Sequence, residues 1–278
     1  TYWQQFENDA SQFFQSDVLA GSPIYETKYL TFNKFNSETI DLSLSYRRTF
    51  PRNEQELDIK ITNSNASNFT DANTKQSAMP KDSMIYGNKN FNPGGNRITE
   101  ISLDYIQPLG KEVLLGTGGK VSMQNIQSDS HIDQYNGFDQ SYAYNSLLSN
   151  HLNYQQEILA AYTEISFPLG NILQTKIGCR YERTNIESLF SNAQNNVNVP
   201  SYNTLVPSIF FSKKLPNRQN IRLSYSKRIQ RPEYEALNPF FNTTDPKNIS
   251  TGNPFLSPEI SHRFELSYTK ENNIGSFT

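Results

Sequence analysis

The sequence predicts an all-β fold, an antiparallel up-and-down transmembrane β-barrel of which about nine to ten strands are present. Three observations lead to this prediction. Apolar and polar residues alternate in repeated short runs, the period of strands with two different environments. Tight turns and long polar connections follow one another strictly, as in barrels with short periplasmic turns and longer external loops. No apolar run reaches the roughly eighteen residues of a membrane-spanning helix.

Composition agrees with this class. Aromatic residues make up 13% of the 278 residues, with 16 Tyr and 18 Phe. The mean hydropathy is only −0.67, which fits barrel strands because they alternate lipid-facing and lumen-facing residues. The 25 basic and 27 acidic residues are well mixed and give a net charge of −2. This balance argues against nucleic acid as a partner.

The N-terminal third contains the first predicted hairpin. Residues 1–37 show no lasting period and are interpreted as a surface loop with room for a short helix or hairpin. Apolar residues then alternate over 39–46, and again over 57–61 after a short polar turn near 49–53. Two alternating runs joined this closely indicate an antiparallel pair. The polar stretch 63–97, rich in Asn, Ser and Thr, is predicted to be a long loop.

The rest of the chain repeats this order. Further strands are predicted at 101–105, 113–124, 159–167, 173–182, 205–214, 221–226 and 263–268. Tight turns are expected near 108–111, 168–171 and 215–219, and long loops near 126–153, 185–203 and 230–259. Glycines inside the strand 113–124 indicate a bend or a close approach of another chain segment.

Polar side chains in these strands are expected to face the lumen. This expectation covers four carboxylates, with three arginines as their ion-pair partners: Glu157, Glu164, Glu182 and Glu265, with Arg180, Arg222 or Arg263.

Residues for catalysis or metal binding do not form any recognisable pattern. The three histidines, His131, His151 and His262, lie far apart and lack the spacing of a metal site. No nucleophile motif occurs. The single Cys179 has no partner for an internal disulfide. The sequence therefore predicts neither an enzyme nor a resident cofactor or metal.

The C-terminal third carries a set of ordered short motifs. They are Arg231-Pro232, Leu237-Asn238-Pro239, Asp245-Pro246, Gly252-Asn253-Pro254, Leu256, Pro258-Glu259 and Phe264-Glu265-Leu266. This segment resembles TonB-dependent outer-membrane receptors. With its Asn-Pro-Phe it is most similar to the receptor β-barrel family common in Bacteroidetes. Runs at 178–184 and 205–208, and Tyr162, resemble the family as well.

The resemblance implies a function and partners. Residues 1–278 would be one partial barrel domain in the outer membrane, with the plug domain outside this chain. The barrel would contact outer-membrane lipid, its own plug and the TonB complex. The implied activity is uptake of a scarce nutrient, such as a ferric chelate, a glycan or a peptide. A receptor relative that signals or assembles other proteins would show the same sequence.

Five polar residues bracket the segment that carries the motifs: Arg228, Arg231, Glu233, Asn238 and Glu259. As ligand-binding residues they would line the outer vestibule. Alternatively, they hold the loop over the barrel rim through hydrogen bonds, which is the favoured interpretation. For the whole chain the competing hypothesis is a soluble all-β binding or adhesion module, a sandwich or propeller, which also shows alternating strands.

Overall fold

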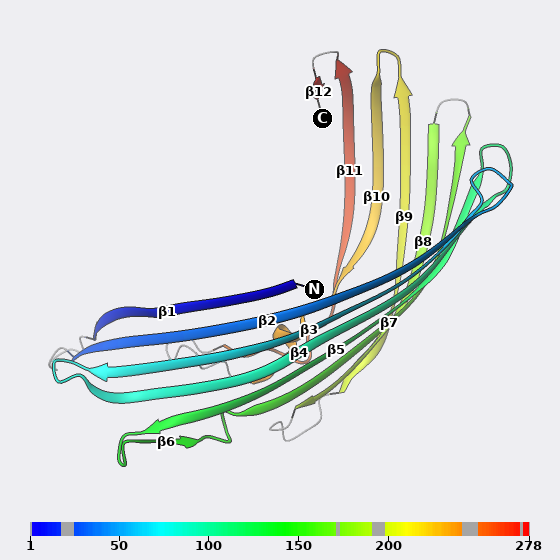
Figure 1. Cartoon of the computed structure of the whole chain (residues 1–278). Helices are drawn as coiled ribbons and strands as arrows, with labels where there is room; N and C mark the ends of the chain where they lie inside the picture. Colours follow the sequence, from blue (N-terminus) through cyan, green and yellow to red (C-terminus); the bar gives the residue numbers. More distant parts are fainter. Residues whose placement is uncertain are drawn as a thin grey trace.

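The protein is a single antiparallel sheet in which successive long strands lie side by side (Figure 1). A computed structural model describes residues 2–17, 25–170, 173–190, 198–240, 250–272 and 275–277. The twelve described strands follow the order of the chain, except that the short β6 pairs with β5 outside this path. This order is the up-and-down arrangement that the sequence predicts. It excludes a sandwich of two sheets and a propeller of separate blades.

The strands and the one helical turn have the following bounds: β1 (Tyr2–Asp17), β2 (Tyr25–Thr49), β3 (Glu56–Ala78), β4 (Ser83–Pro108), β5 (Leu114–Asn136), β6 (Ser141–Tyr144), β7 (Asn150–Leu169), β8 (Leu173–Phe190), β9 (Asn198–Leu215), β10 (Gln219–Gln230), α1 (Tyr234–Leu237), β11 (Glu259–Asn272) and β12 (Gly275–Phe277). The tight turns near 49–53, 108–111 and 215–219 fall where the sequence predicts them, and the turn near 168–171 lies partly outside the described residues. No described helix is long and apolar enough to cross a membrane.

Strand lengths differ from the prediction. Residues 2–17 and 25–37 form an antiparallel strand pair, so the hairpin for which this region has room is present, but the pair is longer than a surface loop would contain. The predicted loop 63–97 is also mostly strand, since β3 and β4 pair along their length and only residues 79–82 join them. Much of the predicted loop 126–153 likewise belongs to β5 and β7. The connection between β10 and β11 does contain a long loop, as predicted.

These extensions escape prediction for a physical reason. A membrane crossing takes about 9–11 tilted residues, whereas β4 has 26 residues and β3 has 23. The parts beyond the crossing are rich in Asn, Ser and Thr, so hydropathy does not alternate there although the backbone is extended. The proline and glycines of β4 strengthen the appearance of a loop. Pairing between β4 and β5 is interrupted at Pro93, which has no backbone N–H to donate.

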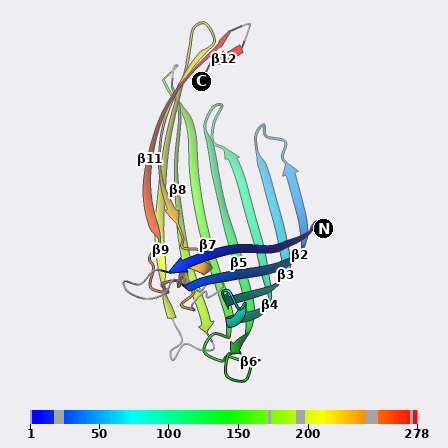
Figure 2. The ribbon, with the colours of Figure 1, turned by 90° about the vertical axis from the view of Figure 1, so that its left-hand side faces the viewer.

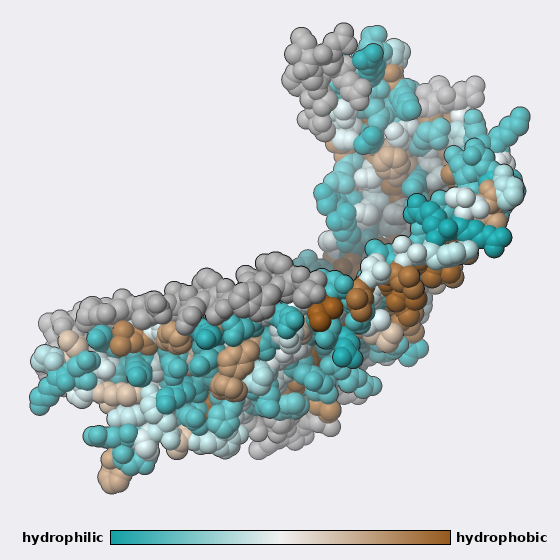
Figure 3. All heavy atoms as spheres, viewed as in Figure 1, coloured by the Kyte–Doolittle hydropathy of each residue, from teal (hydrophilic) through white to brown (hydrophobic). Residues whose placement is uncertain are grey.

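The outer face of the sheet carries a band of apolar side chains. The cross-strand register runs without a shift from β7 through β4 and from β9 to β11, so same-face residues line up in rows. One row joins Ile61, Ile101, Val121 and Leu159. Many of these side chains are exposed, and Leu44 and Phe264 reach 68% and 73%. Hydrophobic side chains gather at the bend of the molecule, between hydrophilic regions (Figure 3). We name this surface the lipid band.

The sheet is an open, curved wall when seen from the side (Figure 2). β1 and β12 end the strand order and do not pair with each other among the described residues. The inner face of this wall carries the polar residues of each alternation, including Lys120 and Glu182. The hydrophobic core lies on the same inner face, where the connection between β10 and β11 covers it.

Candidate functional site

The loop between β10 and β11 is the best-defined feature of the inner wall. We call its residues 231–258 the signature loop, of which 231–240 and 250–258 are described. Two of its motifs lie directly against each other. The backbone N–H of Gly252 donates to the carbonyl of Asn238 at 2.8 Å, and that of Asn253 donates to the carbonyl of Ala236 at 2.7 Å. The motifs Leu237-Asn238-Pro239 and Gly252-Asn253-Pro254 thus form one closed unit.

Glycine is required at position 252 by this contact. A Cβ atom there would lie 2.5 Å from the carbonyl oxygen of Ala236 and 2.6 Å from that of Asn238. Both neighbours are backbone atoms that are already hydrogen-bonded, so they cannot move aside cheaply. Asn238 also fixes the turn locally, because its side-chain oxygen accepts a hydrogen bond from the backbone N–H of Phe240 at 3.1 Å.

The loop is anchored on the wall by an apolar contact. Leu237 at the end of α1 is only 3% exposed. It packs into a cluster of inner-face residues from β5, β7 and β8, with three aromatic residues at the edge: Ile126, Leu152, Tyr154 and Ile186, bordered by Tyr202, Tyr234 and Phe240. Burying a leucine side chain contributes about 1.5–3 kcal/mol.

An ion pair provides the second anchor. The guanidinium of Arg231 donates to the carboxylate of Glu182 on β8. It also donates to the hydroxyl of Thr184, at 3.0 Å from Nη2 and 3.2 Å from Nε. Arg180 donates to the other carboxylate oxygen of Glu182 at 2.5 Å. One buried carboxylate therefore joins the loop to the wall, with both of its oxygens occupied.

The alternation of buried and exposed residues along β8 shows which side of this strand the loop covers. From Tyr181 to Leu189 the even-numbered residues are buried and the odd-numbered residues are exposed or half-buried. The even positions face inward and include Glu182, Thr184 and Ile186, which contact the loop. The loop therefore covers the inner wall at this height.

The five residues that the sequence singled out differ in their surroundings. Arg231 and Asn238 hold the loop, as the favoured interpretation expected. Glu233 precedes α1 and makes no side-chain capping bond. Arg228, Glu233 and Glu259 are exposed and make no side-chain hydrogen bond or ion pair with the described residues. Whether any of the five binds a ligand stays a prediction.

Sequence reasoning missed the partners of the loop. Thr184 and Leu237 stand in the motifs that resemble the receptor family, but nothing in the motifs indicates that they approach one another. Another feature of the sequence could have indicated these partners. Ile126 and Tyr154 are apolar residues on strand faces that should meet water inside a barrel. Apolar residues on an inner face indicate that another segment covers them.

Charged residues on the uncovered inner wall form ion pairs. The pairs are Arg47–Asp58 at 2.7 Å, Lys120–Glu100 at 2.8 Å, Lys176–Glu164 at 2.7 Å and Arg263–Glu265 at 2.5 Å. Lumen-facing Glu164, Glu182 and Glu265 are therefore as predicted. Arg180 and Arg263 are partners as predicted, and Lys176 is the partner of Glu164. Each pair combines one positive and one negative side chain, so these residues make the inner wall polar without adding net charge.

Glu157 corrects the prediction, because it does not face the lumen. It lies on the same face of β7 as Leu159, since the two are separated by one residue in a continuous strand. Its carboxylate accepts a hydrogen bond from the side chain of Asn185 at 3.3 Å. The polar surroundings of Glu157 are explained by its height, because it stands just beyond the lipid band and not within it.

A glycine on the inner wall makes room for a tyrosine. A Cβ at Gly118 would lie 2.6 Å from the ring of Tyr162 and 2.7 Å from the carbonyl oxygen of Leu103. The ring lies over the glycine, and its hydroxyl donates to Asp104 at 2.5 Å. The guanidinium of Arg180 lies 5.2 Å from the ring centroid. The close approach expected from glycines in this strand is confirmed here.

The histidines remain separate in the structure. His131 lies 3.2 Å from the carboxylate of Asp133, and His262 lies 3.0 Å from the hydroxyl of Tyr225. Within the described ranges, no group of three or more His, Cys, Asp or Glu side chains is placed to hold a metal ion. Cys179 is half-buried and forms no disulfide.

Burial also changes one titrating group in the signature loop. It raises the pKa of Tyr234 to about 12, and a hydrogen bond with Glu235 acts in the same direction. The phenol of Tyr234 therefore stays neutral while the loop is packed on the wall.

Three solved structures are similar in shape to parts of this chain. The copper transporter OprC superposes with a TM-score of 0.51 at 8% identity, covering 98% of this chain and 51% of that one. The unliganded ferric citrate transporter FecA gives 0.47 at 13% identity, with coverages of 90% and 41%. The ferric yersiniabactin uptake receptor FyuA from Yersinia pestis gives 0.44 at 10% identity, with coverages of 90% and 43%.

At these identities the likeness concerns the fold alone. The chain spans about half the length of these solved proteins, or less. No curated protein matches the sequence. The family comparison is stronger, because the outer membrane protein beta-barrel family matches residues 48–278. With its single meandering sheet and apolar outer face, the chain belongs to the outer membrane protein beta-barrel family and is an outer-membrane protein.

Proposed function

We propose that this chain is the wall of a TonB-dependent receptor of the type found in Bacteroidetes, and that the receptor takes up a scarce nutrient too large for a porin. A ferric chelate, a glycan or a peptide would fit this role. Energy would come from the TonB complex acting on a plug domain of the whole protein. The wall has no catalytic role in this proposal and contributes a polar inner face and an external loop.

The observation that carries the proposal is the docking of the signature loop on the inner wall. Arg231 and Leu237 hold the loop against β5, β7 and β8. A simple diffusion pore needs an unobstructed lumen, whereas a receptor needs a shaped surface inside its mouth. Plugged transporters of the outer membrane have 22-stranded barrels, and ten long strands are consistent with an arc of such a wall.

The exposed polar residues around the loop supply the ligand-facing part of the proposal. Arg228, Glu233 and Glu259 leave their charges free of protein partners in the described part of the chain. Free charges beside a rigidly held loop can contact a polar solute without first breaking internal ion pairs. We therefore assign capture of the nutrient to these three residues, and positioning of the loop to Arg231 and Asn238.

The test uses the full-length parent protein in its own outer membrane. A strain without the gene is compared with strains that carry the wild type or the variant Arg228→Gln/Glu233→Gln, on media limited in turn for iron chelates, oligosaccharides and peptides. The matched control is Arg52→Gln, an exposed arginine in a turn at the other end of the barrel. Depletion of TonB is the second arm.

We expect the deletion to abolish growth on one solute class, and TonB depletion to have the same effect. The double variant should weaken uptake of that solute, while Arg52→Gln should behave as wild type. Unchanged growth of the deletion strain on every solute class would contradict the receptor. Uptake that continues without TonB would contradict the energy source.

A further inference from the structure

The outer face of the wall changes from apolar to polar along β3, β4, β5 and β7. On these strands the row Ile61, Ile101, Val121 and Leu159 is the last apolar row on the external side, whereas on β2 the apolar residues continue through Leu42 and Ile40. The next row is Asn63, Thr99, Met123, Glu157 and Asn185. From β3 to β8 the row beyond it is polar: Asn65, Arg97, Asn125, Gln155 and Glu187. On these strands, two rows that are polar except for Met123 thus follow the last apolar row directly.

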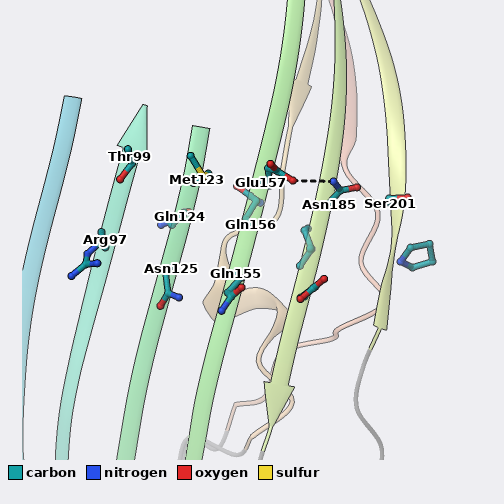
Figure 4. Close-up of a pocket in the computed structure, with 13 residues that line it drawn as sticks. Arg97, Thr99, Met123, Gln124, Asn125, Gln155, Gln156, Glu157, Asn185 and Ser201 are labelled. Atoms are coloured by element: carbon teal, nitrogen blue, oxygen red, sulfur yellow. Dashed lines mark hydrogen bonds between the residues drawn. The ribbon is translucent and has the colours of Figure 1, made fainter. Parts of the chain in front are cut away.

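These two rows line a recess on the outer wall. Its volume is about 820 Å³, and it extends from Arg97 on β4 to Ser201 on β9. A smaller hollow of about 210 Å³ adjoins it and shares Arg97 and Asn125. Figure 4 shows the labelled side chains spread over neighbouring strands of one wall, with the signature loop on the far side. Most of the residues that line the recess face outward, and three others, Gln124, Gln156 and Ile186, occupy inward-facing positions of the same strands.

The recess offers hydrogen-bonding groups that the protein itself does not use. Asn125, Gln155 and Glu187 make no side-chain hydrogen bond with the described residues. Arg97 has only a long contact, 3.5 Å from its Nε to the side-chain oxygen of Asn65. Guanidinium and amide donors therefore stand beside carboxylate and amide acceptors over a few strands. Sugar hydroxyls both donate and accept, so a polyhydroxylated ring matches this set.

The charges in the recess and its position relative to the lipid band further restrict the class of ligand. Glu157 and Glu187 outnumber Arg97, so the recess disfavours a ligand that is mainly phosphate. It lies on the side of the lipid band that leads to the long connections, which is the outer-leaflet side when the tight turns are periplasmic. Its lower rim is the lipid band itself, so a molecule seated there would have its acyl chains against Leu159 and its neighbours.

We propose that this recess binds the neutral sugar part of an outer-leaflet glycolipid headgroup. The acyl chains lie on the lipid band, and the sugars fill the recess between β4 and β9. This site is distinct from the proposed nutrient-binding residues, because most of its lining faces away from the lumen and none of it belongs to the signature loop. Its role is to fix the barrel to particular lipids of the outer leaflet.

The experiment is native mass spectrometry of the full-length protein in detergent, titrated with lipooligosaccharide. Phosphatidylglycerol and phosphatidylethanolamine are titrated in parallel, as is the soluble oligosaccharide released from the lipooligosaccharide. The test variant is Arg97→Ala/Gln155→Ala. The control is Arg222→Ala/Gln174→Ala, which removes the same side-chain types from exposed positions on the inner face. Both proteins are first checked for heat-modifiable migration on a gel.

We expect the test variant to bind lipooligosaccharide at least about tenfold more weakly, the size expected from losing two hydrogen bonds of ordinary strength. The control should bind as wild type, and phospholipids should not distinguish the three proteins. Equal binding of lipooligosaccharide by wild type and test variant would overturn the proposal. Binding of the free oligosaccharide as tight as that of the lipid would overturn the assignment to a membrane glycolipid.

Discussion

Arg231 in the loop and Glu182 in β8 form a buried ion pair between residues that are 49 positions apart in the sequence. The pair decides whether the signature loop lies on the wall or stands away from it. Removing one partner of a buried pair leaves an uncompensated charge and costs about 3–5 kcal/mol. We expect a cost at the lower end of this range, because the Arg231 side chain is still 17% exposed to solvent.

Arg231→Ala should therefore release the loop. The expected result is faster protease cleavage within 231–258 in intact outer membranes, while the strands stay protected. Arg228→Ala is the control, because Arg228 lies three residues earlier and is exposed. Equal cleavage rates for the two variants would mean that the ion pair does not hold the loop.

Leu237→Ala tests the apolar anchor. Truncating a leucine that is 3% exposed should destabilise loop docking by about 2–5 kcal/mol through lost burial and the cavity left behind. Leu256→Ala, at a position that is 40% exposed in the same loop, should have little effect. Hydrogen exchange of the loop amides compares the two, and similar exchange in both would argue against Leu237 as the anchor.

Gly118→Ala tests the close approach on the inner wall. The new methyl group would collide with the ring of Tyr162 and the carbonyl of Leu103, and overpacking of this kind costs about 1–3 kcal/mol. Gly116→Ala is a matched control on the same face of β5, where the nearest atom to a Cβ is 3.8 Å away. The heat-modified gel shift should occur at a lower temperature only for Gly118→Ala.

Leu44→Arg tests the lipid band. A cation at the midplane of a barrel's lipid face costs about 2–4 kcal/mol, whereas lumen positions tolerate charge. The adjacent Ser45 faces inward, so Ser45→Arg changes the same strand without entering lipid. We expect reduced outer-membrane yield for the first variant only. A similar yield for both would show that Leu44 lies outside the hydrocarbon region.

Tyr234 gives a pH-dependent prediction. Burial raises its pKa from 10.0 to about 12 in the docked loop, so the folded state favours the neutral phenol. Its contribution to docking is complete below pH 10 and is lost as the pH rises towards 12. The ultraviolet difference titration between wild type and Tyr234→Phe should show a midpoint near 12. A midpoint near 10 would mean that the phenol is solvated.

The sequence was most informative where one strand face meets lipid. Alternating runs such as Ile40 to Tyr46 identify the membrane crossing, and Pro168-Leu169-Gly170 marks a turn without reference to the rest of the chain. Both signals are local. The parts of β3 and β4 beyond the crossing, around Asn65 and Asn88, were not recognised as strands. Both strand faces are polar there, so hydropathy does not alternate although the backbones are paired.

The inner site was predictable only in part. The motifs around Asn238 and Gly252 indicated an ordered loop, and their mutual contact explains why a glycine stands in the second motif. The position of that loop depends on pairings between distant segments. Glu182 and Ile186 look like ordinary strand residues until Arg231 and Leu237 are seen to rest on them.

The alternation along β8 also changes phase partway along the strand. At Ile177 and Cys179 the apolar side chains point outward, whereas at Ile186 the apolar side chain points inward and Glu187 points outward. Two changes of surroundings account for this reversal: the signature loop covers Ile186 on the inside, and Glu187 lies beyond the lipid band on the outside. The position of the reversal along β8 therefore indicates how deeply this strand is embedded in the bilayer.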